Sequence, residues 1–155
     1  MTETLHAGCV ARLTPQGWAG ALLFGPSGVG KSDLALRLIE RGWALVADDR
    51  AVVWSSAGRL YAKAPPPLAR LIEVRGLDVL AASQREIAPV RLLVDCVGDD
   101  VELDRVPERS ERVIAGVAVE QVALRPREGS AMARVELALR RAVGEPLLTP
   151  AGRGV

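Results

Sequence analysis

The sequence predicts a strand-rich α/β domain. Three observations support this fold class. A glycine-rich loop at 25–32 lies between an apolar run ending at Phe24 and an amphipathic segment beginning at Lys31. Apolar, β-rich segments recur along the chain, whereas only two segments have the periodicity of a long helix. The 155 residues suffice for one compact domain, and a hydrophobic content of 49% argues against general disorder.

The first strands and the first helix surround the glycine-rich loop. Residues 8–14 and 18–24 are predicted to form a hairpin, because Pro15-Gln16-Gly17 is a turn signal. Residues 31–41 place their apolar side chains on one helical face, and Gly42 stands where a helix commonly ends. We therefore expect strand, loop and helix to follow one another directly.

The next segments also read as strands. Residues 43–47 form a buried strand that ends in Asp48-Asp49, and a hairpin follows at 51–56 and 59–64. Residues 68–74 are compatible with either a short helix or an extended approach.

The second half of the chain is predicted, in order, as an apolar strand at 90–97, a polar loop at 98–112, a β-rich stretch at 113–124 and a helix at 129–143. Residues 144–155 are rich in Pro and Gly. We expect a single domain over residues 1–143, followed by a flexible C-terminal tail.

Bulk composition excludes several classes of protein. The formal charge of +1, from 20 basic and 19 acidic residues, argues against bulk electrostatic binding to nucleic acid or membranes. No apolar run approaches the length of a membrane span, and the N-terminus does not resemble a secretory signal. Cys9 and Cys96 have no metal-ligand spacing, which favours buried, reduced thiols. We expect a cytoplasmic protein.

The glycine-rich loop is a complete G-x-x-x-x-G-K-[ST] motif. Its glycines allow backbone N–H groups to converge on an anion, and the following helix adds its positive N-terminal end. Lys31 can reach the β- and γ-phosphates, and the Ser32 hydroxyl can bind Mg²⁺. ATP and Mg²⁺ are therefore the predicted ligands. The residues predicted to bind the nucleotide are Gly25, Pro26, Ser27, Gly28, Val29, Gly30, Lys31 and Ser32.

Acidic residues supply the other half of a phosphoryl-transfer site. Asp48 and Asp49 follow a buried strand, so one carboxylate can bind the metal while the other accepts a hydroxyl proton. The alternative is a solvated turn that starts the next hairpin. Asp95 also ends an apolar strand and competes for the metal role, although an aspartate that caps a turn is the simpler interpretation.

Glu73-Val-Arg75 offers further groups for a metal and a phosphate. A glutamate is a hard oxygen ligand for Mg²⁺, and an arginine matches phosphate geometry. Composition alone favours an ordinary surface ion pair here. His6 is the single histidine, and such a residue is more often structural or exposed than catalytic. Phosphoryl transfer often uses an arginine to neutralise charge on the transferred group, and the sequence supports no choice among Arg105, Arg109, Arg112, Arg125 and Arg127.

These segments resemble the bacterial HPr kinase/phosphorylase family. There the loop reads G-x-S-G-x-G-K-S-E and runs through a helix into R-G-H-x-L-V-A-D-D, which residues 25–49 closely follow. Ile-Glu-Val-Arg-Gly-Leu at 72–77 is similar to the family's E-I-R-G-L signature. Leu5-His6 is similar to its L-H-G-V segment.

The resemblance implies a serine kinase acting on HPr, the small phosphocarrier of phosphotransferase systems. It implies a fold like the nucleotide-binding part of PEP carboxykinase, a hexameric homo-oligomer and, in many members, the reverse phosphorolysis. By position, Asp49 would be the general base, Lys31 would contact phosphate and serve catalysis, and Ser32 and Glu73 would bind Mg²⁺ beside Asp48. His6 and Arg105 would occupy the remaining catalytic positions.

The sequence departs from the family pattern in three places. The family's usual N-terminal domain has no counterpart, which implies a short form with the catalytic domain alone. Extra residues around 14–17 separate His6 from the loop. The late P-V-R-P-G-R stretch, tied to dephosphorylation, is represented by Ala-Leu-Arg-Pro-Arg-Glu at 123–128, where only Arg125 and Pro126 match.

The resulting hypothesis is a Mg²⁺- and ATP-dependent kinase of a seryl hydroxyl on HPr or an HPr-like carrier. Two alternatives remain at this point. One is a small-molecule kinase built on the same core, and the other is a nucleotide-sensing module without transfer activity.

Overall fold

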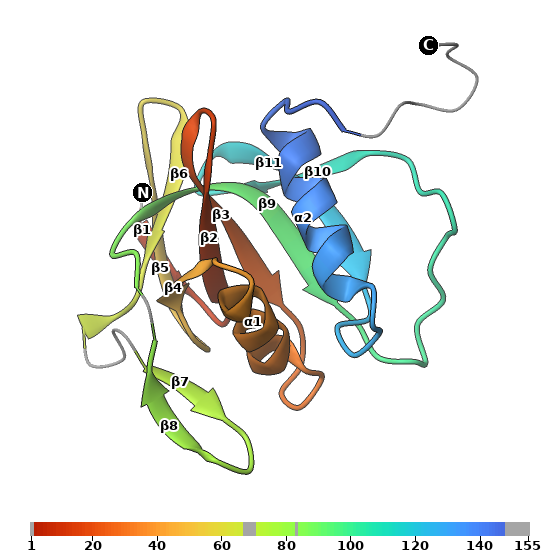
Figure 1. Cartoon of the computed structure of the whole chain (residues 1–155). Helices are drawn as coiled ribbons and strands as arrows, with labels where there is room; N and C mark the ends of the chain where they lie inside the picture. Colours follow the sequence, from red (N-terminus) through yellow and green to blue (C-terminus); the bar gives the residue numbers. More distant parts are fainter. Residues whose placement is uncertain (1, 67–70, 83, 148–155) are drawn as a thin grey trace.

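The computed structural model describes residues 2–66, 71–82 and 84–147. Two helices, α1 (Lys31–Glu40) and α2 (Ala131–Ala142), lie side by side over one face of the central strands (Figure 1). The other face of those strands packs against a second group of strands. The strands, in chain order, are β1 (Thr2–Leu5), β2 (Gly8–Thr14), β3 (Gly17–Phe24), β4 (Ala44–Ala47), β5 (Ala51–Ser56), β6 (Arg59–Lys63), β7 (Leu71–Val74), β8 (Asp78–Ala81), β9 (Ala88–Cys96), β10 (Ser110–Ile114) and β11 (Val117–Leu124).

Strand β9 is the centre of the sheet. It pairs in parallel with β3 along one side. On its other side it pairs with β6 near its start, through Ala62 opposite Ala88, and with β11 further along, from Leu92 to Cys96. The sheet therefore divides at β9 into a branch of β6, β5 and β1 and a branch of β11 and β10, while β3, β2 and β4 follow on the opposite side.

Side-chain alternation along β9 serves two cores. Leu92 and Val94 face α1 and α2, and Leu93 faces the branch that contains β5 and β6. All three side chains are fully buried. Burying such a side chain contributes about 1.5–3 kcal/mol, so these two cores fix the strand that ends beside the glycine-rich loop.

Helix α1 connects this core to the site. Leu34, Ala35 and Leu38 are buried, as the periodicity predicts. The helix ends where Gly42 adopts a φ of 95°, and the N–H of Gly42 donates to the Ile39 carbonyl. Packing of this face points the N-terminal end of the helix, at Lys31, toward the glycine-rich loop.

The predicted strand-rich α/β class is confirmed, and several strand bounds need correction. The predicted loop at 98–112 is wrong at its end, because β10 begins at Ser110 and pairs with β11. The ambiguous segment 68–74 is a strand from Leu71 onward, and its first residues lie outside the described ranges. Strands β1 and β8 were not predicted. Residues 148–155 of the expected tail also lie outside the described ranges.

Two further expectations concern burial and membranes. Cys9 and Cys96 are free and buried, as predicted. In the part of the chain that the structure describes, neither helix has the length and apolar character needed to cross a bilayer.

Candidate active site

Residues 25–30 of the glycine-rich loop join β3 to α1, and their backbone requires glycine. Gly25, Gly28 and Gly30 have φ values of 144°, 83° and 117°. No side chain caps the first turn of α1. The N–H groups at this helix end are therefore available to an anion, as the motif predicts.

Lys31 lies over the loop that precedes it. Its Nζ donates to the carbonyl oxygens of Gly25 and, at 3.1 Å, of Pro26. Lys31 also lines a cavity of about 410 Å³ beside the loop. The lysine of the motif therefore borders both the loop and this cavity.

That cavity draws its walls from segments far apart in the sequence. The glycine-rich loop and α1 form one side, and the other lining residues come from the start of β2, the residues after β4, β7 with the residue that follows it, and the segment before α2. Its charged lining residues are Lys31, Asp33, Asp48, Asp49, Glu73, Arg75 and Arg127. Three cations and four carboxylates therefore face one space.

Asp48 ties the start of α1 to β7. The Ser32 hydroxyl donates to Asp48 Oδ1 at 2.9 Å, and the backbone N–H of Glu73 donates to Asp48 Oδ2 at 3.2 Å. Ser32, Asp48 and Glu73, the predicted metal ligands, all line the cavity. Within residues 2–66, 71–82 and 84–147, no three acidic, histidine or cysteine side chains form a ready-made cation cluster.

Asp49 has a different partner. Its Oδ1 lies 2.7 Å from His6 Nε2, and both side chains are largely exposed, at 61% and 53%. Asp49 also adopts a φ of 67°, which is uncommon for a residue other than glycine. The turn after β4 therefore directs the two adjacent carboxylates to separate partners, one to Ser32 and one to His6.

The structure does not bring every predicted residue to this cavity. Arg105 lies in the exposed segment between β9 and β10 and does not line the cavity, so its catalytic role stays a prediction. Asp95 lies outside it as well, 3.5 Å from Arg112 Nη1. The interpretation of Asp95 as a metal ligand has no support from this placement.

Arg127 is the residue that sequence reasoning did not single out. Of the five arginines that the sequence could not separate, it is the one that lines the cavity. Its Nη2 donates to the Gly28 carbonyl. The two partners are 99 residues apart in the sequence, so no local pattern links them. The sequence singled out residues 123–128 only through their partial match to the family's arginine-containing stretch.

The chain is similar in sequence to known proteins of one family. The family model described as HPr Serine kinase C-terminal domain matches residues 13–143. An HPr kinase/phosphorylase from Burkholderia cenocepacia is 38% identical over 136 residues, which are 80% of this chain and 42% of that protein. One from Limosilactobacillus reuteri is 36% identical over 125 residues, 74% of this chain and 39% of that protein.

A solved structure also resembles this fold. The Hpr(Ser) kinase/phosphatase from Coxiella burnetii aligns with a TM-score of 0.76 at 23% identity, covering 90% of this chain and 95% of that chain. The chain spans less than half the length of the two curated relatives described above.

Proposed function

The chain belongs to the family described as HPr Serine kinase C-terminal domain, and we propose that it is an ATP-dependent kinase of a seryl hydroxyl on HPr or an HPr-like phosphocarrier. One observation carries this proposal. A glycine-rich loop with Lys31 and two adjacent carboxylates with separate partners share one cavity.

The cavity suits a nucleotide whose phosphates are held by the loop. The left-handed glycines and the uncapped helix end present N–H groups, and Lys31 supplies a cation. Four carboxylates and three cations line this space, so its side chains supply no net positive charge to neutralise a polyphosphate. That charge pattern fits a nucleotide bound with a divalent cation.

Ser32, Asp48 and Glu73 would hold that cation. Protein-bound Mg²⁺ is commonly held by one or two carboxylates together with water and phosphate oxygens, and Asp48 and Glu73 are two such carboxylates. When bound, Mg²⁺ would neutralise charge that develops on the phosphates. The hydrogen bond from Ser32 to Asp48 orients the hydroxyl and the carboxylate toward each other.

Asp49 would act on the serine hydroxyl. Its carboxylate lines the cavity, is exposed, and is free of the Ser32 contact made by its neighbour. It would accept the hydroxyl proton as the seryl oxygen attacks the γ-phosphorus and the bond to the β-phosphate oxygen breaks. His6, at 2.7 Å, would orient the Asp49 carboxylate.

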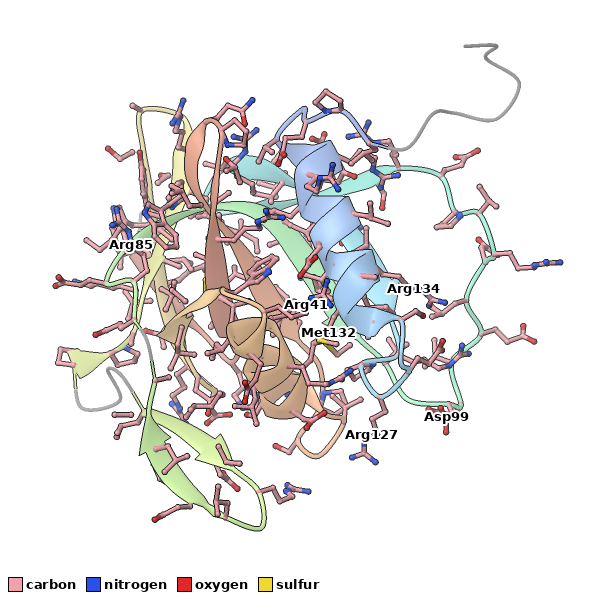
Figure 2. The ribbon with its side chains drawn as sticks, in the orientation of Figure 1. Arg41, Arg85, Asp99, Arg127, Met132 and Arg134 are labelled. Carbon is pink, nitrogen blue, oxygen red and sulfur yellow. The ribbon has the colours of Figure 1, made fainter. Side chains whose placement is uncertain are left out.

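The test combines transfer with a matched carboxylate control. The purified chain is incubated with labelled ATP, Mg²⁺ and HPr, and label on HPr is measured. Asp49→Asn should abolish transfer with nucleotide binding largely retained. Asp99→Asn, at a fully exposed carboxylate outside the cavity, should transfer normally (Figure 2). Full activity of Asp49→Asn would remove Asp49 as the base.

The same assay separates the alternatives. Absence of label on HPr with intact nucleotide binding would refute the HPr substrate, and metabolites offered in competition would then reveal a small-molecule kinase. Tight ATP binding with no transfer to any acceptor would favour a nucleotide sensor.

The reverse reaction is a second candidate, because the matched relatives are named HPr kinase/phosphorylase. Inorganic phosphate would attack the phosphoserine phosphorus, the seryl oxygen would leave with a proton from Asp49, and pyrophosphate would form. Incubating phosphoseryl-HPr with phosphate and measuring pyrophosphate tests this activity.

Family membership also supports the remaining proposals. These are a fold like the nucleotide-binding part of PEP carboxykinase, one catalytic domain over residues 1–143, a hexamer, and a cytoplasmic location. Catalytic roles for Lys31 and Arg105 belong with them.

A further inference from the structure

Arg127 reaches the glycine-rich loop from the segment between β11 and α2. Its Nη2 donates to the Gly28 carbonyl, and its Cγ would lie 3.4 Å from a Cβ atom at Gly30. The side chain is exposed and forms part of the cavity wall. Figure 2 shows Arg127 below α2, at the edge of the molecule where the loop lies. The guanidinium is therefore close to the space that the loop offers to phosphates.

The backbone on both sides of Arg127 is held by Arg37 of α1. Arg37 Nη2 donates to the Pro126 carbonyl, and Arg37 Nη1 contacts the Glu128 carbonyl at 3.5 Å. Asp33 braces Arg37, with Oδ2 at 3.1 Å from Arg37 Nε. Helix α1, which begins at the loop, thus fixes the segment that carries Arg127.

Three of the other candidate arginines pair with carboxylates away from the cavity or stack on a ring. Arg112 lies 4.4 Å from the Phe24 ring centre and pairs with Asp95. Arg109 pairs with Glu120, and Arg125 lies near Asp99 and Glu128. Among the described ion pairs, Arg127 has no carboxylate partner.

We propose that Arg127 binds the terminal phosphate of the nucleotide and that Arg37 is a positioning residue for it. The Gly28 carbonyl is a neutral acceptor, whereas a phosphate oxygen carries charge and accepts a stronger hydrogen bond from a guanidinium. A phosphate beside the loop therefore draws the guanidinium from the carbonyl. This inference rests on the proposed function only in taking a nucleoside triphosphate as the ligand.

Affinities for ATP and ADP, measured by calorimetry with Mg²⁺, test the role of Arg127. Arg127→Gln should weaken ATP binding by about 10- to 100-fold, because a charge-assisted contact is lost. ADP binding should change by far less, so the preference for ATP falls. Arg127→Lys should retain part of the preference, since it keeps the charge but not the planar fork.

Arg134→Gln is the matched control. It removes one guanidinium from α2 that pairs with Glu128 at 3.5 Å and does not line the cavity (Figure 2). Its ATP preference should equal that of the parent chain. Equal losses in the Arg127 and Arg134 variants, or equal losses for ATP and ADP in the Arg127 variant, would overturn the proposal.

A double-mutant cycle tests Arg37. Arg37→Gln should lower the preference for ATP over ADP. The double variant Arg37→Gln/Arg127→Gln should bind ATP like Arg127→Gln alone, because both substitutions remove the same contact between Arg127 and the phosphate. Arg37→Lys should restore part of the preference. If Arg37→Gln lowers the melting temperature but leaves the ATP preference unchanged, Arg37 has only a structural role and does not position Arg127.

The two proposals fail separately. No transfer to HPr, together with an ATP preference that depends on Arg127, would refute the HPr substrate and leave this inference standing. Transfer to HPr, together with an ATP preference that does not depend on Arg127, would refute this inference and leave the HPr substrate standing.

Discussion

Among the described glycines, an added Cβ would make its shortest contact at Gly25, so replacement there should be the most destabilising. Its φ is 144°, and a Cβ at this position would lie 2.5 Å from the Cys96 carbonyl oxygen and 3.2 Å from Cys96 Cβ. Cys96 ends β9, the central strand, so the obstacle is backbone that cannot move aside cheaply. Gly28 provides a matched comparison in the same loop, with a φ of 83° and nothing within 4 Å of the added Cβ.

Two costs add in Gly25→Ala. The unusual φ costs about 1–3 kcal/mol, and overpacking against β9 costs about 1–3 kcal/mol more. Gly28→Ala carries only the left-handed backbone cost of about 1–2 kcal/mol. In a chain of this size each kcal/mol lowers the melting temperature by about 2–4 °C, so a combined cost of about 4 kcal/mol predicts a fall of about 8–16 °C.

Thermal unfolding of the two variants, followed by circular dichroism without nucleotide, measures this difference. Gly25→Ala should melt well below Gly28→Ala. Equal melting temperatures for the two variants would refute the reasoning, because they would show that contact with β9 costs nothing.

Three further predictions concern other parts of the chain. Asp48→Ala should lower the free energy of unfolding by about 0.5–1.5 kcal/mol, because the part-buried Ser32 hydroxyl and the exposed Glu73 N–H lose their acceptor; an unchanged denaturant midpoint would contradict this. Hydrogen bonds from Arg41 lower the pKa of Glu136, so the stability this carboxylate adds is complete above the ordinary Glu pKa and disappears as pH falls through the lowered value. Glu136→Gln should therefore flatten the acid side of the melting-temperature curve, and a curve of unchanged shape would exclude that pair from the acid response. Burial raises the pKa of Cys9 and of Cys96 to about 12, so neither thiol should react with a thiol reagent until denaturant is added, and rapid labelling of the folded chain would show that a thiol is accessible.

Strands with a buried face were predictable from sequence, and exposed edge strands were not. Strands β2, β3 and β9 carry apolar side chains that local pattern detects. Strand β1 reads Thr-Glu-Thr-Leu and is mostly exposed, and it exists because its backbone pairs with β5. The start of β10 depends in the same way on β11. Such pairing supplies hydrogen bonds without an apolar pattern, so sequence periodicity does not report it.

The residues of the candidate site likewise fall into those that a local sequence pattern predicts and those that only the fold brings together. Its contiguous parts, the glycine-rich loop and Asp48-Asp49, were visible because each motif lies within a few residues of a strand end. Choosing among five arginines was impossible, because their distances from the loop depend on how the segments before and after β10 and β11 pack.

The sequence by itself determined the loop, the helix that follows it and the paired carboxylates, since short-range spacing and backbone preference specify all three. Only the tertiary structure decided that His6 lies beside Asp49, that Asp95 forms an ion pair with Arg112, and that Arg127 lines the cavity. These contacts join residues distant in the chain. Strand pairing and helix packing create them, and no local pattern of residues records which distant side chains will meet.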